Sequence, residues 1–170
     1  MKRTVREKLE STFKNIRLLV PEDDRVLVTA ENNNVHTLLR FLKDEGFGHL
    51  ALVSAVDWIE NDIFELCYIL TSYEQDESDS NKNGLHIILK TKIPRKEPEF
   101  ETITSIFPNA EPYEREIYEL FGIKFEGHKR LIPLLLEREY TIPPFRKDFD
   151  TRKYVEGVFQ KIPFVEDKDK

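Results

Sequence analysis

Three long strand-like runs in the middle of the chain most strongly limit how it can fold. They are residues 49–58 (HLALVSAVDW), 63–72 (IFELCYILTS) and 85–93 (LHIILKTKI). Their length and their content of β-branched and aromatic residues favour strands over helices. The polar turn at residues 60–62 predicts a hairpin between the first two runs, and the acidic loop at residues 73–84 most simply joins two antiparallel neighbours.

The segments before these runs predict further helices and strands. Residues 2–17 carry apolar side chains at helical spacing, and residues 25–30 (RVLVTA) predict a strand. Asn32 to Asn34 offer N-caps for a second helix with apolar residues at 35–42. Gly46 suits the C-terminal stop of this helix.

The remaining elements complete the expected fold. Residues 100–107 suit a short helix ended by Pro108, and after about residue 129 the chain is proline-rich and lacks the periodicity needed for a core of its own. The order of elements predicts an α+β fold, a mostly antiparallel sheet of about four strands with helices packed on one side. We expect a domain at residues 1–128 and an extended docking tail at residues 129–170, which wraps its own domain or lies on a partner.

The composition disfavours several classes of function. A net charge of -6 is a poor match for nucleic acid or an anionic membrane. The single cysteine, Cys67, closes no disulfide within the chain and cannot hold an iron–sulfur cluster by itself. No run reaches the roughly 18 apolar residues that cross a bilayer, and the first ten residues resemble neither a signal nor a transit peptide. Many Glu and Lys residues with only two Gln are typical of thermophiles.

The stretch PYEREIYELFGIKFEGH, residues 112–128, predicts a helix followed by a short strand and a turn. Pro112 suits the first helical turn, and Gly122 suits the C-terminal stop. Glu114 and Glu116 lie near the positive end of the helix, where carboxylates are favoured.

Arg115 and Glu119 lie one turn apart, on the side of this helix opposite its apolar face. One interpretation is an ion pair on a solvated face, which contributes little to stability. The other is that Arg115, Tyr118 and Glu119 contact a partner, because Arg and Tyr are enriched at interface hot spots.

Two features downstream of this helix are candidate sites. Gly127 and His128 predict a turn, and His128 with a nearby Glu is a candidate acid/base pair. No nucleophile elbow, phosphate loop or HExxH motif accompanies it, so a turn-stabilising or interface histidine is the better interpretation. The extended segment PPFRKDFD, with Arg146, Lys147 and Asp148 between two Phe residues, suits either docking across a surface or an ordinary surface loop.

The run EREIYELFGIKFEGH, followed further along by FRKD, resembles the signature of the NuoC-like family. This family is the small hydrophilic subunit of respiratory NADH:quinone oxidoreductase (complex I) and of related membrane-bound NiFe hydrogenases. Val56-Asp57-Trp58 also resembles the family pattern, whereas Pro112, Lys129 and Phe145 depart from it and favour a hydrogenase-type relative. The matching motif positions are Glu114, Arg115, Glu116, Tyr118, Glu119, Phe121, Gly122, Ile123, Phe125, Gly127, His128, Arg146, Lys147 and Asp148.

The resemblance implies a cofactor-free structural subunit in the peripheral arm of a membrane-bound redox complex, on the cytoplasmic face of the membrane. The implied partners are a hydrogenase-like or NuoD-like large subunit, an iron–sulfur small subunit and, indirectly, membrane-arm subunits, with no nucleic acid. The nickel–iron centre and iron–sulfur clusters are expected in those partners. Arg115, Tyr118 and Glu119 are expected contacts, and residues 146–148 are expected to dock on the large subunit.

Three alternatives remain open. The chain is a subunit of complex I proper, a stand-alone acid/base enzyme that uses His128 with Glu114 or Glu116, or an RNA-binding module on a ferredoxin-like sheet. The acidic net charge disfavours the last.

Overall fold

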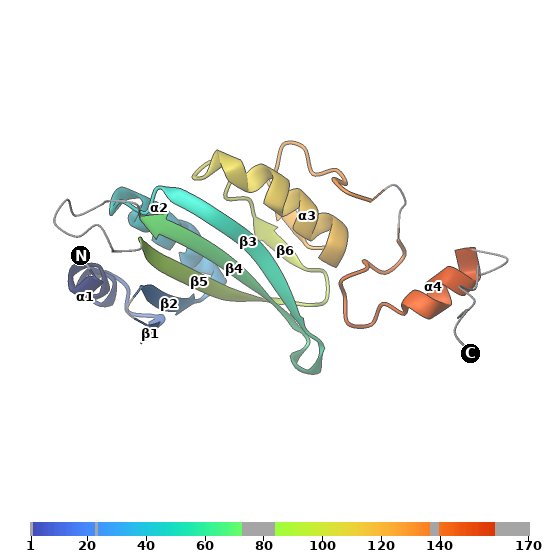
Figure 1. Cartoon of the computed structure of the whole chain (residues 1–170), viewed down its shortest axis with the longest axis horizontal. Helices are drawn as coiled ribbons and strands as arrows, with labels where there is room; N and C mark the ends of the chain where they lie inside the picture. Colours follow the sequence, from blue (N-terminus) through green and yellow to red (C-terminus); the bar gives the residue numbers. More distant parts are fainter. Residues whose placement is uncertain (1, 23, 73–83, 137–139, 159–170) are drawn as a thin grey trace, which may run out of the picture.

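The three strand-like runs form three adjacent strands of a five-stranded sheet (Figure 1). The computed structural model describes residues 2–22, 24–72, 84–136 and 140–158. The strands of the sheet are β1 (Ile16–Glu22), β2 (Arg25–Ala30), β3 (His49–Trp58), β4 (Ile63–Ser72) and β5 (Leu85–Pro94). Their order is β1-β2-β5-β4-β3, and every neighbouring pair is antiparallel except β2 and β5. The predicted hairpin and the antiparallel neighbours around the acidic loop are confirmed.

Four helices and a small second sheet complete the described structure. The helices are α1 (Lys2–Thr12), α2 (Val35–Asp44), α3 (Glu111–Phe121) and α4 (Thr151–Val158). One-turn 3-10 helices lie at Asn32–Asn34, Ile59–Asn61 and Pro108–Ala110. β6 (Glu99–Glu101) and β7 (Lys124–Glu126) pair in parallel. The α+β class with a mostly antiparallel sheet is therefore confirmed.

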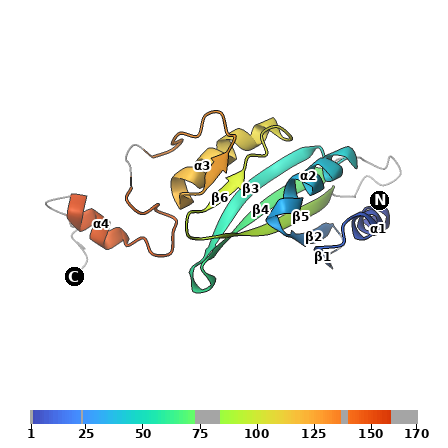
Figure 2. The same ribbon diagram turned by 180° about the vertical axis from the view of Figure 1, so that it is seen from behind.

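The core lies between the sheet and α2, as Figure 2 shows with α2 in front of the strands. Alternate side chains of β4 are fully buried and belong to the same apolar cluster as those of α2. These side chains are Phe64, Leu66, Tyr68, Leu70, Leu38, Leu39 and Leu42. The buried side chains recur at every second residue of β4 and at helical spacing on α2, so both elements could be predicted from the sequence.

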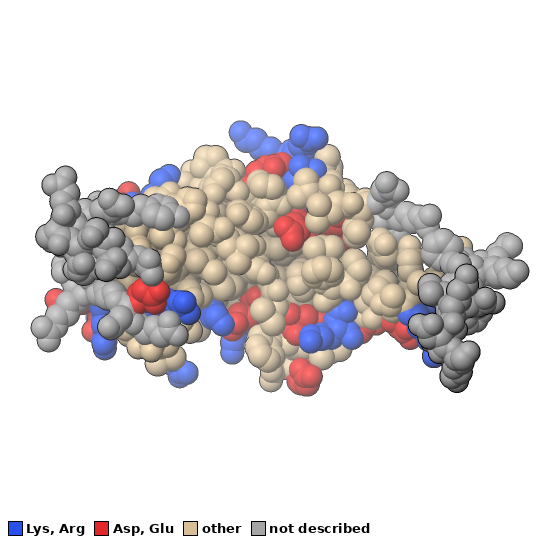
Figure 3. Space-filling model, in the orientation of Figure 1, with Lys and Arg blue, Asp and Glu red and all other residues tan. Residues whose placement is uncertain are grey.

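Helix α3 lies along the outer edge of β3. The Tyr113 hydroxyl donates to the carbonyl oxygen of Ala51 at 3.0 Å, and the Asn109 amide donates to that of Leu50 at 2.9 Å. These bonds satisfy edge carbonyls that would otherwise be open to pairing with another strand. Figure 3 looks onto the sheet from the side away from α2, and its centre is largely uncharged, with charged residues gathered along the margins.

The N-terminal helix is shorter than predicted. The stripe expected over residues 2–17 ends at Thr12, and Ile16 begins β1, which is a strand beyond the four expected. Pro21 lies within β1, and a proline is tolerated there because β1 is an edge strand of the sheet. The Asn run forms a 3-10 turn, and Asn34 occupies the N-cap position of α2 as predicted, although its side chain makes no cap bond.

The helix predicted for residues 100–107 is also wrong. Phe100 lies in β6, and the turn that follows leads into the 3-10 helix at Pro108–Ala110. Phe100, Ile103, Ile106 and Phe107 are all buried, so their apolar character marks core residues on an irregular segment rather than one face of a helix.

Beyond β7 the chain leaves the sheet, runs back past α3 and reaches α4, which stands apart from the sheet in Figure 1. α4 has no buried residue, but Tyr154 stacks on Tyr140 with ring centroids 4.7 Å apart. In the described part of the chain, no helix has the length and apolar content needed to cross a bilayer.

Candidate functional site

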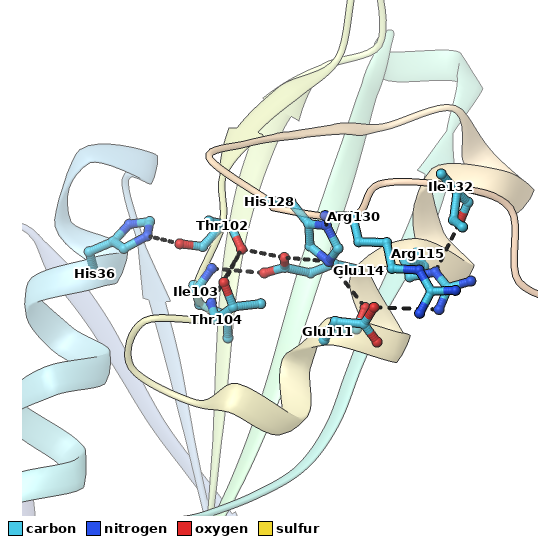
Figure 4. A network of polar contacts seen from close by, with 10 residues as sticks. All are labelled: His36, Thr102, Ile103, Thr104, Glu111, Glu114, Arg115, His128, Arg130 and Ile132. Atoms are coloured by element: carbon cyan, nitrogen blue, oxygen red, sulfur yellow. Dashed lines mark hydrogen bonds and ion pairs between the residues drawn. The ribbon is translucent and has the colours of Figure 1, made fainter.

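The charged motif residues hold the segment that follows β7. We call residues 129–136 and 140–150 the strap. Three groups of contacts fix it to the domain: at the middle of α3, at the C-terminal end of α3, and at the end of β3. Figure 4 shows Arg115 and Ile132 of the first group together with a buried polar cluster beside them.

Arg115 bonds the backbone of the strap. Its Nε donates to the carbonyl oxygen of Ile132 at 3.0 Å, and its Nη2 donates to that of Pro133 at 2.9 Å. Nη1 pairs with Glu111 at 3.4 Å on the preceding turn of α3. Arg115 is only 8% exposed, so the solvated ion pair with Glu119 that one sequence interpretation proposed is wrong.

Glu119 binds the next three residues of the strap. Its carboxylate accepts the backbone N–H groups of Leu134, Leu135 and Leu136 at 2.9, 2.8 and 2.6 Å. Burial alone would raise the pKa of Glu119, but these three hydrogen bonds and the nearby Arg115 charge lower it below its ordinary value. Arg115 and Glu119 therefore act on the same loop, one through its carbonyls and the other through its N–H groups.

The second group lies at the C-terminal end of α3. The N–H of Phe145 donates to the Leu120 carbonyl at 2.9 Å, and Arg146 Nε donates to the Phe121 carbonyl at 2.7 Å. These bonds satisfy carbonyls that a helix end leaves without partners. The Arg146 guanidinium also lies 5.2 Å from the Phe64 ring centre, and its burial followed by the nearby Arg95 charge lowers its pKa.

Gly122 ends α3 in the left-handed conformation, with φ of 74°, and directly faces the strap. A Cβ at this position would lie 2.9 Å from Pro143 Cγ. We expect Gly122→Ala to lower the free energy of unfolding by about 1–3 kcal/mol, because it adds backbone strain to this clash. The matched control is Gly48→Ala, where a Cβ would meet nothing within 4 Å. Denaturant unfolding of both variants measures the difference, and equal stability would contradict this account of Gly122.

The third group is an ion pair at the end of β3. The Asp57 carboxylate accepts from Arg95 Nε at 2.9 Å and from Arg95 Nη2 at 3.2 Å, and it also accepts the backbone N–H of Lys147 at 2.8 Å. Arg95 reaches Asp148 at 2.6 Å as well. Burial by itself would raise the pKa of Asp57, but the bonds from Arg95 and Lys147 outweigh it and leave the pKa lowered.

A buried polar cluster lies beside the first group (Figure 4). Glu114 is fully buried and accepts the Thr102 hydroxyl at 2.5 Å and the Ile103 N–H at 2.8 Å. Burial raises the pKa of Glu114, although these two bonds and the neighbouring His128 and His36 oppose the rise. This carboxylate ties α3 to the segment that leaves β6.

His128 is also buried within this cluster. Its Nδ1 lies 3.1 Å from the Arg130 N–H and accepts that bond, so Nε2 carries the proton and points to the Glu111 carbonyl at 3.4 Å. Nε2 is 3.9 Å from Glu114, and the His128 side chain is only 1% exposed. Gly127 precedes it with φ of 79°, a turn conformation that favours glycine. Both ring nitrogens are therefore engaged within the chain.

The structure brings together most, but not all, of the residues singled out in the sequence. Arg115 and Glu119 share one loop, and Glu114 and His128 share the buried cluster. Lys147 and Asp148 join the ion pair of Asp57 and Arg95, whereas Arg146 bonds the end of α3. Glu116 and Tyr118 are half-buried on α3. Whether Arg115, Tyr118 and Glu119 also contact a partner stays a prediction.

Sequence reasoning missed the partners of these residues. Nothing in the sequence singled out Arg95, Thr102 or Glu111, because they lie outside the motif at residues 114–128. Only the fold brings them into contact with the residues that had been singled out. Among the residues that the structure describes, no group of three or more His, Cys, Asp or Glu side chains is placed to hold a metal ion.

The comparison with protein families matches this motif to a known subunit. The sequence model described as respiratory-chain NADH dehydrogenase, 30 Kd subunit, matches residues 28–155. The chain belongs to this family. The NuoC-like resemblance of the motif in α3 and β7 is thereby confirmed, and the strap lies inside the matched region.

Individual relatives of this chain agree with its assignment to the family of the 30 Kd subunit. An F(420)H(2) dehydrogenase subunit of Methanosarcina mazei is 34% identical over 128 residues, which cover 74% of this chain and 76% of the relative. An NADH-quinone oxidoreductase subunit of Herpetosiphon aurantiacus is 30% identical over 149 residues, covering 85% and 82%. The corresponding NADH-quinone oxidoreductase subunit of Novosphingobium aromaticivorans is 32% identical over 137 residues, but this chain spans only 41% of that relative.

Two solved structures are similar to the 30 kDa-subunit fold seen here. A chain in the structure of the membrane-bound sulfane sulfur reductase (MBS), an archaeal respiratory membrane complex, matches with a TM-score of 0.82 and 30% identity. That match covers 99% of this chain and 97% of the other. The trypsin-resistant fragment (1-134) of Nqo5 matches with a TM-score of 0.63 at 24% identity, covering 76% of this chain and 98% of the fragment, and shares the fold.

Proposed function

We propose that this chain is a cofactor-free structural subunit of the peripheral arm of a membrane-bound redox complex. It packs on a hydrogenase-like or NuoD-like large subunit, next to an iron–sulfur small subunit, at the cytoplasmic face of the membrane. The redox centres belong to those partners, and this chain supports electron transfer coupled to ion translocation by holding the arm together. The tail at residues 129–170 is the part that docks on the large subunit.

The observation that carries this proposal is the likeness over the whole chain to a component of the MBS structure. The match covers 99% of this chain with a TM-score of 0.82, so it spans the strap and α4 as well as the sheet. A helix without buried residues, held at the end of a strap that is itself fixed to the domain, suits a segment that packs on another protein.

The geometry of the motif favours a structural role over catalysis. The Arg115 guanidinium and the Glu119 carboxylate bind backbone groups of the strap, and Asp57 binds Arg95 and Lys147. An acid/base enzyme that uses His128 has no support, because the His128 side chain is buried and both of its nitrogens are engaged. A general base must reach the proton that it abstracts from a substrate.

The complex itself is tested by purification from native membranes in a gentle detergent, followed by mass spectrometry. We expect a hydrogenase-like or NuoD-like large subunit and an iron–sulfur subunit to copurify with this chain. Nickel bound to the recovered complex would assign it to the hydrogenase type, and its absence would favour a quinone- or sulfur-reducing type. Recovery of this chain alone as a soluble monomer would contradict the proposal.

A truncation after Asp150 tests the docking role of α4 and the residues beyond it. This truncation keeps every contact of the strap with the domain, and α4 contributes no buried residue. We expect the stability of the isolated chain to change by no more than about 1 kcal/mol, mainly through loss of Tyr154 stacking. Recovery of the partner subunits should fall strongly, and full recovery would show that this end of the chain does not dock.

A truncation before Arg146 is a less informative variant. It also removes Asp148 and the Lys147 N–H from the ion pair at Asp57. The domain would then lose stability of its own, and a loss of assembly could not be assigned to docking. The comparison of the two truncations separates the contribution of residues 146–150, with the contacts of Arg146 and the third group, from that of α4.

A further inference from the structure

The strap presents an uninterrupted apolar run on the surface. We call residues 131–136, LIPLLL, the leucine loop. Leu131 packs on the core, whereas Ile132 is 44%, Leu134 38% and Leu135 61% exposed. Apolar side chains exposed side by side on a soluble domain mark an interaction surface more often than single exposed ones do.

Side chains of α3 bind the backbone of the leucine loop. Two of its carbonyls accept bonds from Arg115, and three of its N–H groups donate to Glu119. Because these polar groups face α3, the aliphatic side chains are left to face outward. A loop fixed in this way loses little conformational entropy on binding, which favours tight docking.

The charges around the leucine loop indicate what it meets. Lys129 and Arg130 immediately precede it and are exposed, and Figure 3 shows Lys and Arg atoms at the upper margin, over the loop beside α3. This basic spot stands on a chain whose net charge is -6. Charge complementarity therefore favours a partner surface that carries carboxylates next to an apolar depression.

Two other occupants fit less well. Two hollows of the described chain are lined largely by polar residues, Asn32, His36 and Glu99 in one and Asn15, Arg17 and Lys92 in the other, so neither is a good match for the leucine loop of a second copy. A lipid surface is disfavoured because anionic headgroups select basic flanks, whereas only the Lys129-Arg130 side of the loop is basic and the sequence after it runs Glu-Arg-Glu.

We propose that the leucine loop is a docking surface that inserts its aliphatic side chains into an apolar pocket with an acidic rim on another subunit of the complex. The inference rests on the proposed function, since it needs a partner subunit. It assigns Arg115 and Glu119 to positioning: they shape the loop, and the side chains of the loop make the contact.

The direct test places the photo-crosslinking residue benzoylphenylalanine at Leu135 in the complex within native membranes. We expect illumination to join this chain to one other subunit, at a peptide that combines apolar residues with Asp or Glu. Adducts only with a second copy of this chain, adducts only with lipid, or no adduct would each overturn the proposal.

Substitution gives an independent arm of the test. Leu135→Asp should leave thermal unfolding of the isolated chain unchanged and lower recovery of the partner subunits by about tenfold or more. The matched control is Leu19→Asp on β1, a leucine of similar exposure at 58%, which should not change recovery. Full recovery of the partner subunits with Leu135→Asp overturns only the proposal that the leucine loop docks. A wild-type chain that purifies without partners overturns the proposed function as well.

Discussion

Replacement of Arg95 with methionine is expected to lower the free energy of unfolding by about 3–5 kcal/mol, because it leaves a buried carboxylate without its charged partner. The Asp57 side chain is only 1% exposed and would keep only the Lys147 N–H of the contacts described above. Asp148 would also lose its bond to Arg95, so the Lys147 N–H would be left as the one contact described above between the strap and Asp57. Denaturant unfolding of the isolated chain measures the change.

The control for this prediction is Lys96→Met, the exposed basic residue next to Arg95, which should change stability by less than about 0.5 kcal/mol. Asp57→Asn and the double variant complete a mutant cycle. If the pair acts as the geometry indicates, the double variant costs much less than the sum of the two single ones, because the double variant, unlike Arg95→Met, leaves no lone buried carboxylate. Equal costs for Arg95→Met and Lys96→Met would contradict the account.

No local pattern could have identified this pair. Asp57 and Arg95 are 38 residues apart, and Arg95 and Asp148 are 53 apart, so only the finished fold brings them together. The sequence did mark the two ends separately, as the Val56-Asp57-Trp58 step and as the Arg-Lys-Asp segment. It held no sign that they meet, because the residue joining them lies in an unremarkable basic stretch after Pro94.

The parts of the fold that follow from local periodicity were predictable. β3, β4 and β5 were predicted almost residue for residue, since each alternates buried and partly exposed side chains over ten residues. β1 was not, because Ile16 continues the apolar spacing of the helix before it and Pro21 interrupts the strand pattern. β6 was not, because it has three residues and pairs with β7, whose residues lie more than twenty positions away. Apolar spacing at residues 100–107 fitted a helix equally well.

The bounds of α3 were predictable, but the groups that its charged side chains bind were not. Pro112 in the first turn and Gly122 in the left-handed stop are local signals, and both are confirmed. Arg115 and Glu119 were placed opposite the apolar face, as periodicity requires. That side of the helix is covered by the strap, whose irregular backbone has no periodicity to reveal it, so a surface that was expected to be solvated or bound to a partner is occupied by the chain itself.

Replacement of Glu114 with alanine is the second change expected to be severe, at about 2–5 kcal/mol of unfolding free energy. It leaves the Thr102 hydroxyl and the Ile103 N–H buried without their acceptor and opens a cavity in the core. Glu114→Gln should cost far less, because the amide oxygen can accept from Ile103 and the Thr102 hydroxyl can turn to accept from the amide. Glu116→Ala, two residues along the same helix and half-buried, is the control and should be mild.

The pH dependence of the Gln variant separates hydrogen bonding from charge. The folded-state pKa of Glu114 is raised above its ordinary value of 4.5 by burial, so the folded chain holds this proton more tightly than the unfolded chain does. Wild-type stability from this group is therefore fully present below pH 4.5 and is lost as the pH rises through the folded pKa. The pKa values of Asp57 and Glu119 are lowered, so these two groups lose their contribution to stability as the pH falls. This loss is the same in the wild type and in Glu114→Gln, so it cancels in the difference between them. The stability difference between wild type and Glu114→Gln should thus shrink as pH rises from about 4.5. A difference that stays constant with pH would mean that Glu114 is not buried as a carboxyl group in the folded chain.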